Sequence, residues 1–335
     1  METRVKPKIF RLILTVAILA IFLALCLASL YAYVIYKGIN SAGRFENATL
    51  VEVTKQESVT SLSQKLSELN ILDNQNYFQY GARIYLSELK PGYYEILPKS
   101  SIKDILLLFE SGKTKVVKLT FPEGWRAEQI AARLDQNGVV AYEQFLVEAK
   151  AYEGKLFPDT YFFQPKMSAK EVVAMMLADF QNRTSGLVVT NEDLIIASLV
   201  EREAAKDEER PLIAGIYKNR LKQGMKLQAD PTVQYGKDTN EIAKLRLLDS
   251  LIGFKYWKPI TLADYQGVKS DYNTYRILAL PPRPIANPGL KSIEATINYE
   301  HHKYLFFLQS DGKIYPSETS AQHDYYRRKM LGAKN

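Results

Sequence analysis

The chain has 335 residues, of which 47% are apolar and 24% charged, and its formal net charge at pH 7 is +7. This is a globular composition with core enough for more than one domain, and the basic residues are too dispersed to favour nucleic-acid binding. Cys26 is the only cysteine, which excludes a disulfide framework. The three histidines lack the spacing of a zinc site, which favours a mechanism without metal or cofactor.

The first predicted element is a membrane-spanning helix. Residues 12–35 contain no charged side chain, and a helix of that length spans roughly 36 Å, enough to cross a bilayer. Basic residues precede it, which predicts a cytoplasmic N-terminus over residues 1–11 and an extracytoplasmic remainder. A cleaved signal peptide is the alternative, but the apolar run is too long for one. We therefore expect a single-pass anchor in the cell membrane over residues 12–36.

A short linker over residues 37–47 and a small module over residues 48–115 are predicted next. The module is expected to contain the following elements: a strand at 50–53, a helix at 58–69 after a serine cap, a strand after the Pro91-Gly92 turn, and a helix at 102–109 that ends at Gly112.

Residues 116–335 are predicted to form a larger mixed α+β domain. Residues 117–121 alternate like a strand, residues 128–134 and 142–151 are expected to be helical, and Asp311-Gly312 between two apolar runs predicts a β-hairpin. The fold class of the whole chain is therefore α+β, with an N-terminal transmembrane helix ahead of a small module and a larger domain.

A predicted helix near residue 200 contains the candidate catalytic residue. Ile196, Leu199, Val200 and Glu203 follow each other at i, i+3, i+4 and i+7, which puts Glu203 on the apolar face, whereas Glu201 points away from it. A carboxyl group on a packed surface has a raised pKa and can hold the proton that a general acid needs at pH 7. The alternative is that the apolar stripe simply ends at Glu203, with its carboxylate in water.

A second helix is predicted from Glu209 to Leu221, with Pro211 in its first turn and Gly224 at its end. Residues 224–236 are expected to form a short polar loop, because Asp230-Pro231 breaks a helix. Such a loop can line a cleft.

Over this stretch the sequence resembles the MltG (YceG-like) family of endolytic murein transglycosylases. The resemblance is carried by these segments: Ala197-Ser198-Leu199-Val200-Glu201-Arg202-Glu203, Glu209-Arg210, Asn219-Arg220-Leu221 and Gly224 through Gly236. Further family motifs occur in the same order: Glu123-Gly124-Trp125, Leu156 through Tyr161, Tyr272 through Tyr275, Leu280-Pro281-Pro282 and Asn287-Pro288-Gly289.

The resemblance implies that residues 116–335 cut the bond between N-acetylmuramic acid and N-acetylglucosamine in peptidoglycan glycan strands. Glu203 would protonate the glycosidic oxygen and then accept the proton of the C6 hydroxyl, which attacks C1 and leaves a 1,6-anhydro end. The resemblance also implies a LysM-like module at 48–115, for which a plain spacer is the alternative. Penicillin-binding protein synthases are candidate partners.

The candidate substrate-contact residues are Gln228, Asp230, Thr232, Tyr235, Asn273 and Tyr275. The candidate supporting residues are Glu201, Arg210, Asn219 and Arg220, and Glu201 is expected to pair with Arg210 or Arg220. Two other functions stay open: a hydrolytic muramidase in which Asp230 activates water, and a non-catalytic scaffold that binds the cell wall.

Overall fold

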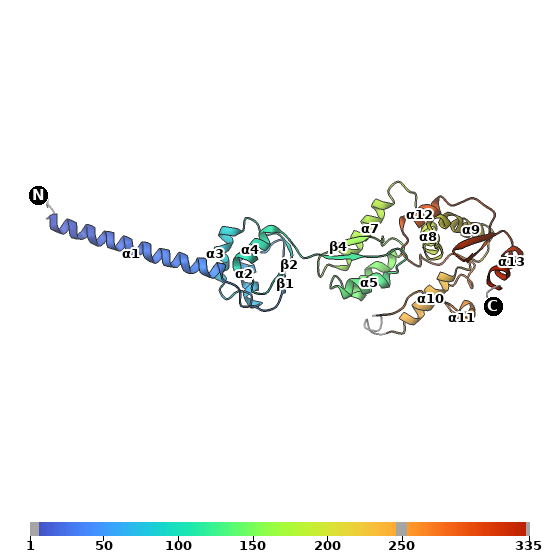
Figure 1. Cartoon of the computed structure of the whole chain (residues 1–335), viewed down its shortest axis with the longest axis horizontal. Helices are drawn as coiled ribbons and strands as arrows, with labels where there is room; N and C mark the ends of the chain where they lie inside the picture. Colours follow the sequence, from blue (N-terminus) through green and yellow to red (C-terminus); the bar gives the residue numbers. More distant parts are fainter. Residues whose placement is uncertain (1–6, 246–252, 333–335) are drawn as a thin grey trace. The chain divides into compact units, whose positions relative to one another are not determined.

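The computed structural model describes residues 7–245 and 253–332, and the chain divides into two compact units, Met1–Val116 and Val117–Asn335. Figure 1 labels most of their helices and strands along the chain. The elements of the first unit are α1 (Pro7–Asn40), β1 (Thr49–Val53), α2 (Val59–Glu68), α3 (Gln75–Tyr85), β2 (Gly92–Ile96) and α4 (Ile102–Ser111).

Most of the first unit agrees with the sequence prediction. Strands β1 and β2 pair antiparallel, with Val51 opposite Tyr94, and the helices cover the apolar face of this sheet. The Ser58 hydroxyl accepts a hydrogen bond from the Ser61 amide at 3.0 Å, so the predicted serine cap of α2 is confirmed. Helix α3 was not predicted.

The apolar N-terminal helix extends further than expected. Phe10–Asn40 has a mean hydropathy of 2.9 in its most apolar stretch, which makes it long and apolar enough to cross a membrane. Its last turn enters the core of the first unit: Ile39 is 2% exposed, and Gly38 lies so close to Tyr77 that an added Cβ would be 2.5 Å from the ring. The predicted linker over 37–47 is therefore helical and packed up to Asn40, and irregular only from Ser41 onward.

The second unit begins with the elements β3 (Val117–Thr120), α5 (Ala127–Gln136), α6 (Tyr142–Ala149), the 3₁₀ turn η1 (Lys150–Tyr152), β4 (Thr160–Phe163) and α7 (Ala169–Arg183). Strands β3 and β4 pair antiparallel, and the three helices pack against them around Phe121, Phe145 and Phe163. This part of the unit has an apolar core of its own.

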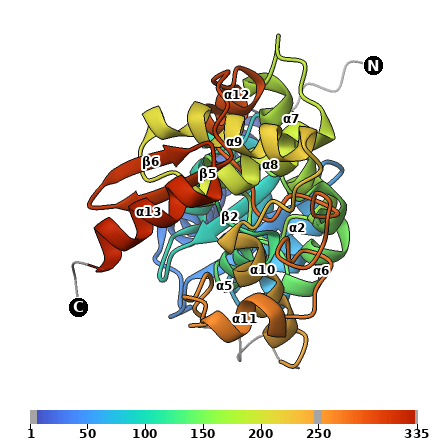
Figure 2. The same cartoon turned by 90° about the vertical axis from the view of Figure 1, so that its right-hand side faces the viewer.

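The rest of the second unit contains α8 (Asn191–Glu203), the 3₁₀ turn η2 (Asp207–Glu209), α9 (Arg210–Lys222), α10 (Asp230–Ile242), α11 (Leu262–Gly267), α12 (Leu290–Ile297), β5 (Phe306–Ser310), β6 (Lys313–Ser317) and α13 (Ser320–Leu331). Helix α8 is central and packs against α9, α10 and α12. Figure 2 shows α13 lying along the β5–β6 hairpin. Asp311 and Gly312 have φ angles of 52° and 68° at the turn, so the predicted hairpin is confirmed.

One local prediction is wrong. Residues 224–236 were expected to be a loop, but only the part up to Ala229 is irregular, because Asp230 begins α10. Pro231 lies in the first turn of that helix, where the missing amide hydrogen would have had no partner within the helix. Asp230-Pro231 therefore starts a helix instead of interrupting one.

Candidate active site

Glu203 lies where a buried helix meets a cavity. The side chains of α8 from Asp193 to Val200 are all buried, and the helix ends at Glu203, which is only partly buried. Its carboxyl group lines a cavity of about 640 Å³, whose walls come from α8, α9, α10, α11, the β5–β6 hairpin and α13. The predicted apolar face of the helix therefore leads directly to this cavity.

The surroundings of Glu203 favour its protonated form. Burial raises the pKa of Glu203 to about 7, and the negative charge of Asp230 also raises it. The Tyr217 hydroxyl donates a hydrogen bond to Glu203 Oε1 at 3.1 Å and partly opposes this shift. Because Tyr217 is 1% exposed, its position in α9 fixes the direction of that hydrogen bond. A carboxyl group in this setting can both give and take a proton near pH 7.

A second carboxylate lines the same cavity. Asp230, at the start of α10, accepts a hydrogen bond from the Tyr275 hydroxyl at 2.6 Å and one from the Tyr265 hydroxyl at 3.3 Å. The ring centroids of the two tyrosines are 4.4 Å apart, so the two rings pack against each other. Asp230 is thus held in place by two hydroxyl groups.

Arg220 and Gln228 line the same cavity as these two carboxyl groups. Arg220 donates to the carbonyl oxygens of Leu305 at 2.5 Å and Leu227 at 2.6 Å, and its Nη1 lies 3.4 Å from Gln228 Oε1. Gln228 has a φ of 50°, in the left-handed region that few residues with a side chain adopt. Such strain persists only where the surroundings enforce it, and it is concentrated at functional sites.

Three of the six candidate contact residues line the cavity, namely Gln228, Asp230 and Tyr275. The other three do not, and they stabilise the segments next to it. Thr232 donates to the Ala229 carbonyl at 2.6 Å, and Asn273 donates to the Val268 carbonyl at 2.9 Å. Tyr235 is buried beneath the guanidinium group of Arg126, 3.8 Å from its ring centre.

The candidate supporting residues have mostly structural contacts. Glu201 pairs with Arg210 at 3.4 Å and accepts hydrogen bonds from the Gly289 amide and the Ser292 hydroxyl, so the expected ion pair is confirmed for Arg210. Asn219 donates to the His302 carbonyl at 2.7 Å. Of the four, only Arg220 lines the cavity.

Several residues around the cavity escaped sequence reasoning. Tyr217 and Tyr265 contact the two carboxyl groups; Tyr217 lies in the predicted helix from Glu209 to Leu221 but was not singled out there, and no element was predicted around Tyr265. The face that α13 turns to the cavity consists of Ser320, His323, Asp324 and Arg327. Their i, i+3, i+4, i+7 spacing was available as a signal, but a polar stripe on a helix usually faces solvent. Among the residues that the structure describes, no group of three or more histidine, cysteine or acidic side chains could hold a metal ion.

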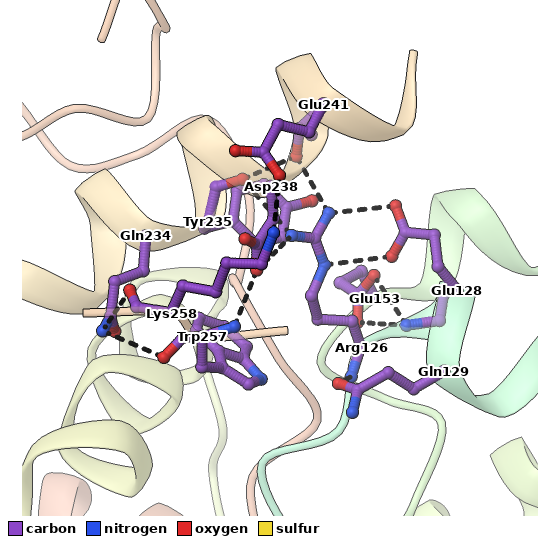
Figure 3. A network of polar contacts seen from close by, with 12 residues as sticks. Arg126, Glu128, Gln129, Glu153, Gln234, Tyr235, Asp238, Glu241, Trp257 and Lys258 are labelled. Carbon is purple, nitrogen blue, oxygen red and sulfur yellow. Dashed lines mark hydrogen bonds and ion pairs between the residues drawn. The ribbon is translucent and has the colours of Figure 1, made fainter. Parts of the chain in front are cut away.

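A buried arginine connects the two parts of the second unit (Figure 3). The side chain of Arg126, just before α5, is 0% exposed and makes two parallel hydrogen bonds of 3.1 Å to Glu128. It also donates to the Tyr235 carbonyl at 3.2 Å and the Thr239 hydroxyl at 2.9 Å on α10, and lies 3.9 Å from Asp238. Arg126 therefore links α5 to the helix that begins with Asp230.

The fold and the cavity define a two-unit α+β protein with an apolar N-terminal helix and a candidate active site built around a protonatable glutamate. The model of the YceG-like family matches residues 51–329. The chain therefore belongs to the YceG-like family.

Known proteins with similar sequences carry the name endolytic murein transglycosylase. Those of Streptococcus pneumoniae strains D39 and R6 are each 27% identical over an alignment of 348 positions, gaps included, and the alignment covers 88% of this chain. The chain spans about 60% of the length of these two relatives. The relative from Bacillus subtilis strain 168 is 27% identical over 324 residues, 85% of either chain.

A solved structure is also similar. The crystal structure of a yceG-like protein from Listeria monocytogenes aligns with a TM-score of 0.51 and 28% identity. The alignment covers 83% of this chain and 98% of the Listeria chain.

Proposed function

We propose that this protein is a membrane-anchored lytic transglycosylase that cuts the β-1,4 bond between N-acetylmuramic acid and N-acetylglucosamine in nascent glycan strands. The observation that carries the proposal is the Glu203 carboxyl group, which lines a large cavity and has a pKa of about 7 because it is buried. The names of the relatives support murein as the substrate class. Cleavage would occur within the strand, because the names of those relatives describe them as endolytic.

One carboxyl group can perform both proton transfers. Protonated Glu203 would donate its proton to the glycosidic oxygen as the bond from that oxygen to C1 of muramic acid breaks. The resulting Glu203 carboxylate would take the proton of the C6 hydroxyl while O6 forms the new bond to C1. The proton is thereby restored to Glu203, no water is consumed, and the product ends in a 1,6-anhydro sugar. The Asp230 carboxylate would stabilise the positive charge that develops on the sugar ring.

A hydrolytic muramidase is the second candidate, and one observation favours it. Asp230 supplies a second carboxylate in the same cavity, and glycosidases that use water pair an acid with a second carboxylate. Asp230 would then activate a water molecule or act as the nucleophile, and the product would end in a reducing sugar.

The products decide between these functions. Purified full-length protein is incubated with uncrosslinked glycan strands, and the fragments are analysed by mass spectrometry. We expect anhydro ends, whereas ends that are heavier by one water molecule would establish the muramidase instead. Strands that remain intact at every protein concentration would leave a wall-binding scaffold as the function.

The rate of cleavage is expected to fall as the pH rises through about 7. Glu203 must begin the reaction protonated, and the protonated fraction decreases tenfold for each pH unit above its pKa of about 7. A profile of kcat/KM from about pH 5 to pH 9 measures this decrease, since the pH dependence of kcat/KM reports the pKa values of essential groups in the free enzyme. A rate that is unchanged between pH 6 and pH 9 would contradict the role of Glu203 as the acid.

The N-terminal regions would place the enzyme at its substrate. Helix α1 would anchor the chain in the cell membrane with residues 1–11 in the cytoplasm and residues 37–335 outside it, which the apolar helix and its basic flank support. Protease added to intact spheroplasts should then digest the chain beyond the membrane helix, and protection of residues 37–335 would refute this orientation.

Residues 48–115 of the first unit would act as a LysM-like module that contacts glycan, or else as a spacer. Penicillin-binding protein synthases would supply the nascent strands.

A further inference from the structure

Helix α13 presents a polar face to the cavity that the proposed reaction does not use. Ser320, His323, Asp324 and Arg327 follow each other at i, i+3, i+4 and i+7, and all four line the cavity that contains Glu203. Their helix packs along the β5–β6 hairpin, which forms the adjacent wall (Figure 2). A stripe of this kind on a cavity wall is suited to binding a polar part of the substrate.

Arg327 is the more exposed of the two arginines that line this cavity. The described residues lining the cavity include two arginines, Arg220 and Arg327. Arg220 is only 7% exposed, and it donates from Nε to the Leu305 carbonyl and from Nη1 to the Leu227 carbonyl. The side chain of Arg327 is 59% exposed, and its contact with Asp324 is a single ion pair at 3.7 Å within one helix. A guanidinium group in this state can bind a carboxylate through two parallel hydrogen bonds.

His323 adds a group without a partner. Its ring stacks on Phe306 with centroids 5.7 Å apart and an angle of 25° between the planes. Its Nδ1 atom is buried and, within the part of the chain that the structure describes, makes no hydrogen bond. Burial lowers the pKa of His323, and the nearby charge of Arg327 lowers it further, so the neutral ring can offer Nδ1 to a ligand. Buried polar atoms in proteins are rarely left unpaired, so this nitrogen is a candidate acceptor for a hydrogen bond from the substrate.

We propose that the α13 face binds the peptide attached to the lactyl group of muramic acid, with Arg327 paired to a peptide carboxylate and His323 hydrogen-bonded to a peptide amide. This inference rests on the proposed function, because it deepens the description of the same substrate. The peptides on nascent strands are acidic and rich in amides, which matches an exposed guanidinium group beside an unpaired imidazole nitrogen. The protein would therefore recognise strands that carry peptides over bare glycan.

The test measures binding instead of cleavage. The full-length chain with Glu203→Gln, in detergent micelles, is titrated with three fluorescent oligosaccharides of equal length. The first carries peptides with a free carboxylate on the second residue, the second carries the same peptides with that carboxylate amidated, and the third has had its peptides removed. We expect the first to bind about tenfold more tightly than the second, as a charge-assisted pair implies.

Substitutions on α13 then assign the preference to residues. Arg327→Gln should abolish the difference between the free and amidated peptides, whereas Arg328→Gln, at an exposed position outside the cavity, should preserve it. His323→Phe keeps an aromatic ring on Phe306 and should weaken only the two ligands that carry peptides.

Three results would overturn the proposal. Arg327→Gln could weaken all three ligands equally, or change none of them. The bare glycan, whose lactyl carboxylate is free, could bind most tightly and lose that advantage in Arg327→Gln, which would assign the cation to the lactyl group. Since binding is measured without cleavage, a wild-type chain that never cuts glycan would refute the proposed enzyme while leaving the peptide preference measurable.

Discussion

Replacing Glu203 with glutamine is expected to lower the kcat for glycan cleavage by a factor of about 100 to 10,000, the range that a positioned general acid contributes. Glutamine has nearly the same shape and can still accept the Tyr217 hydrogen bond, but it has no proton to give to the glycosidic oxygen. The chain should remain folded and should still bind glycan. Release of soluble fragments from purified peptidoglycan measures the rate, and circular dichroism checks the fold.

Glu201→Gln is the matched control two residues away. Glu201 is paired with Arg210 and does not line the cavity, so its substitution should reduce stability and leave the rate per folded molecule largely intact. The assignment of Glu203 fails if the Glu203 variant cleaves at the wild-type rate, or if the two variants lose kcat to the same extent.

The same Glu203→Gln variant should be more stable than wild type at alkaline pH. The pKa of Glu203 is about 7 in the folded chain against 4.5 for the ordinary side chain, so the folded state holds this proton more tightly. That contribution to stability is complete below about pH 4.5 and is lost as the pH rises through 7. Glutamine does not titrate, so above pH 8 the free energy of unfolding should favour the variant by up to about 3 kcal/mol. Urea unfolding at pH 5 and pH 8.5 tests this.

Arg126→Met is expected to destabilise the second unit by about 3–5 kcal/mol, the usual result of removing one partner from a buried ion pair. Methionine fills much of the space but leaves the Glu128 carboxylate without its two hydrogen bonds and Asp238 without its nearby cation. Tryptophan fluorescence during denaturant unfolding suits the measurement, because both tryptophans of the chain, Trp125 and Trp257, lie beside Arg126.

Two further variants show whether the geometry of this pair matters. Arg126→Lys keeps the charge but cannot reproduce the paired hydrogen bonds to Glu128 or stack over Tyr235, so it should recover only part of the loss. Lys258→Gln removes an exposed ion pair to Glu241 in the same region and should cost less than about 1 kcal/mol. A shift for Arg126→Met as small as that for Lys258→Gln would mean that the network contributes little.

Local patterns were sufficient to predict Glu203 as the candidate acid. Its position follows from the spacing of apolar residues within one helix, and that periodicity survives folding because α8 is buried among other helices. The Arg126 network could not be predicted in this way, because Arg126 and Tyr235 are 109 positions apart and nothing near Arg126 indicates its partners. Tyr235 was predicted to contact the substrate because its neighbours in sequence are polar. Those neighbours do not indicate that Arg126, far away in the sequence, covers its ring.

Helices α7 and α13 were not predicted, and of these two only α7 has a clear signal in the sequence. Helix α7 has a complete capping box between Ser168 and Glu171 and an apolar spacing that includes Val172 and Met176, so its signal was present in the sequence. Helix α13 has few apolar residues, and its polar face lines a cavity. That arrangement depends on the hairpin before it.

The junction between α1 and the first unit has a mechanical consequence. Ile39 belongs to the core of that unit and Gly38 lies against Tyr77, so no slack chain separates the helix from the module. With α1 inserted in a bilayer, any tilt or rotation of the helix turns the module with it. The distance of the first unit from the membrane surface would then be set by the position of α1 in the bilayer.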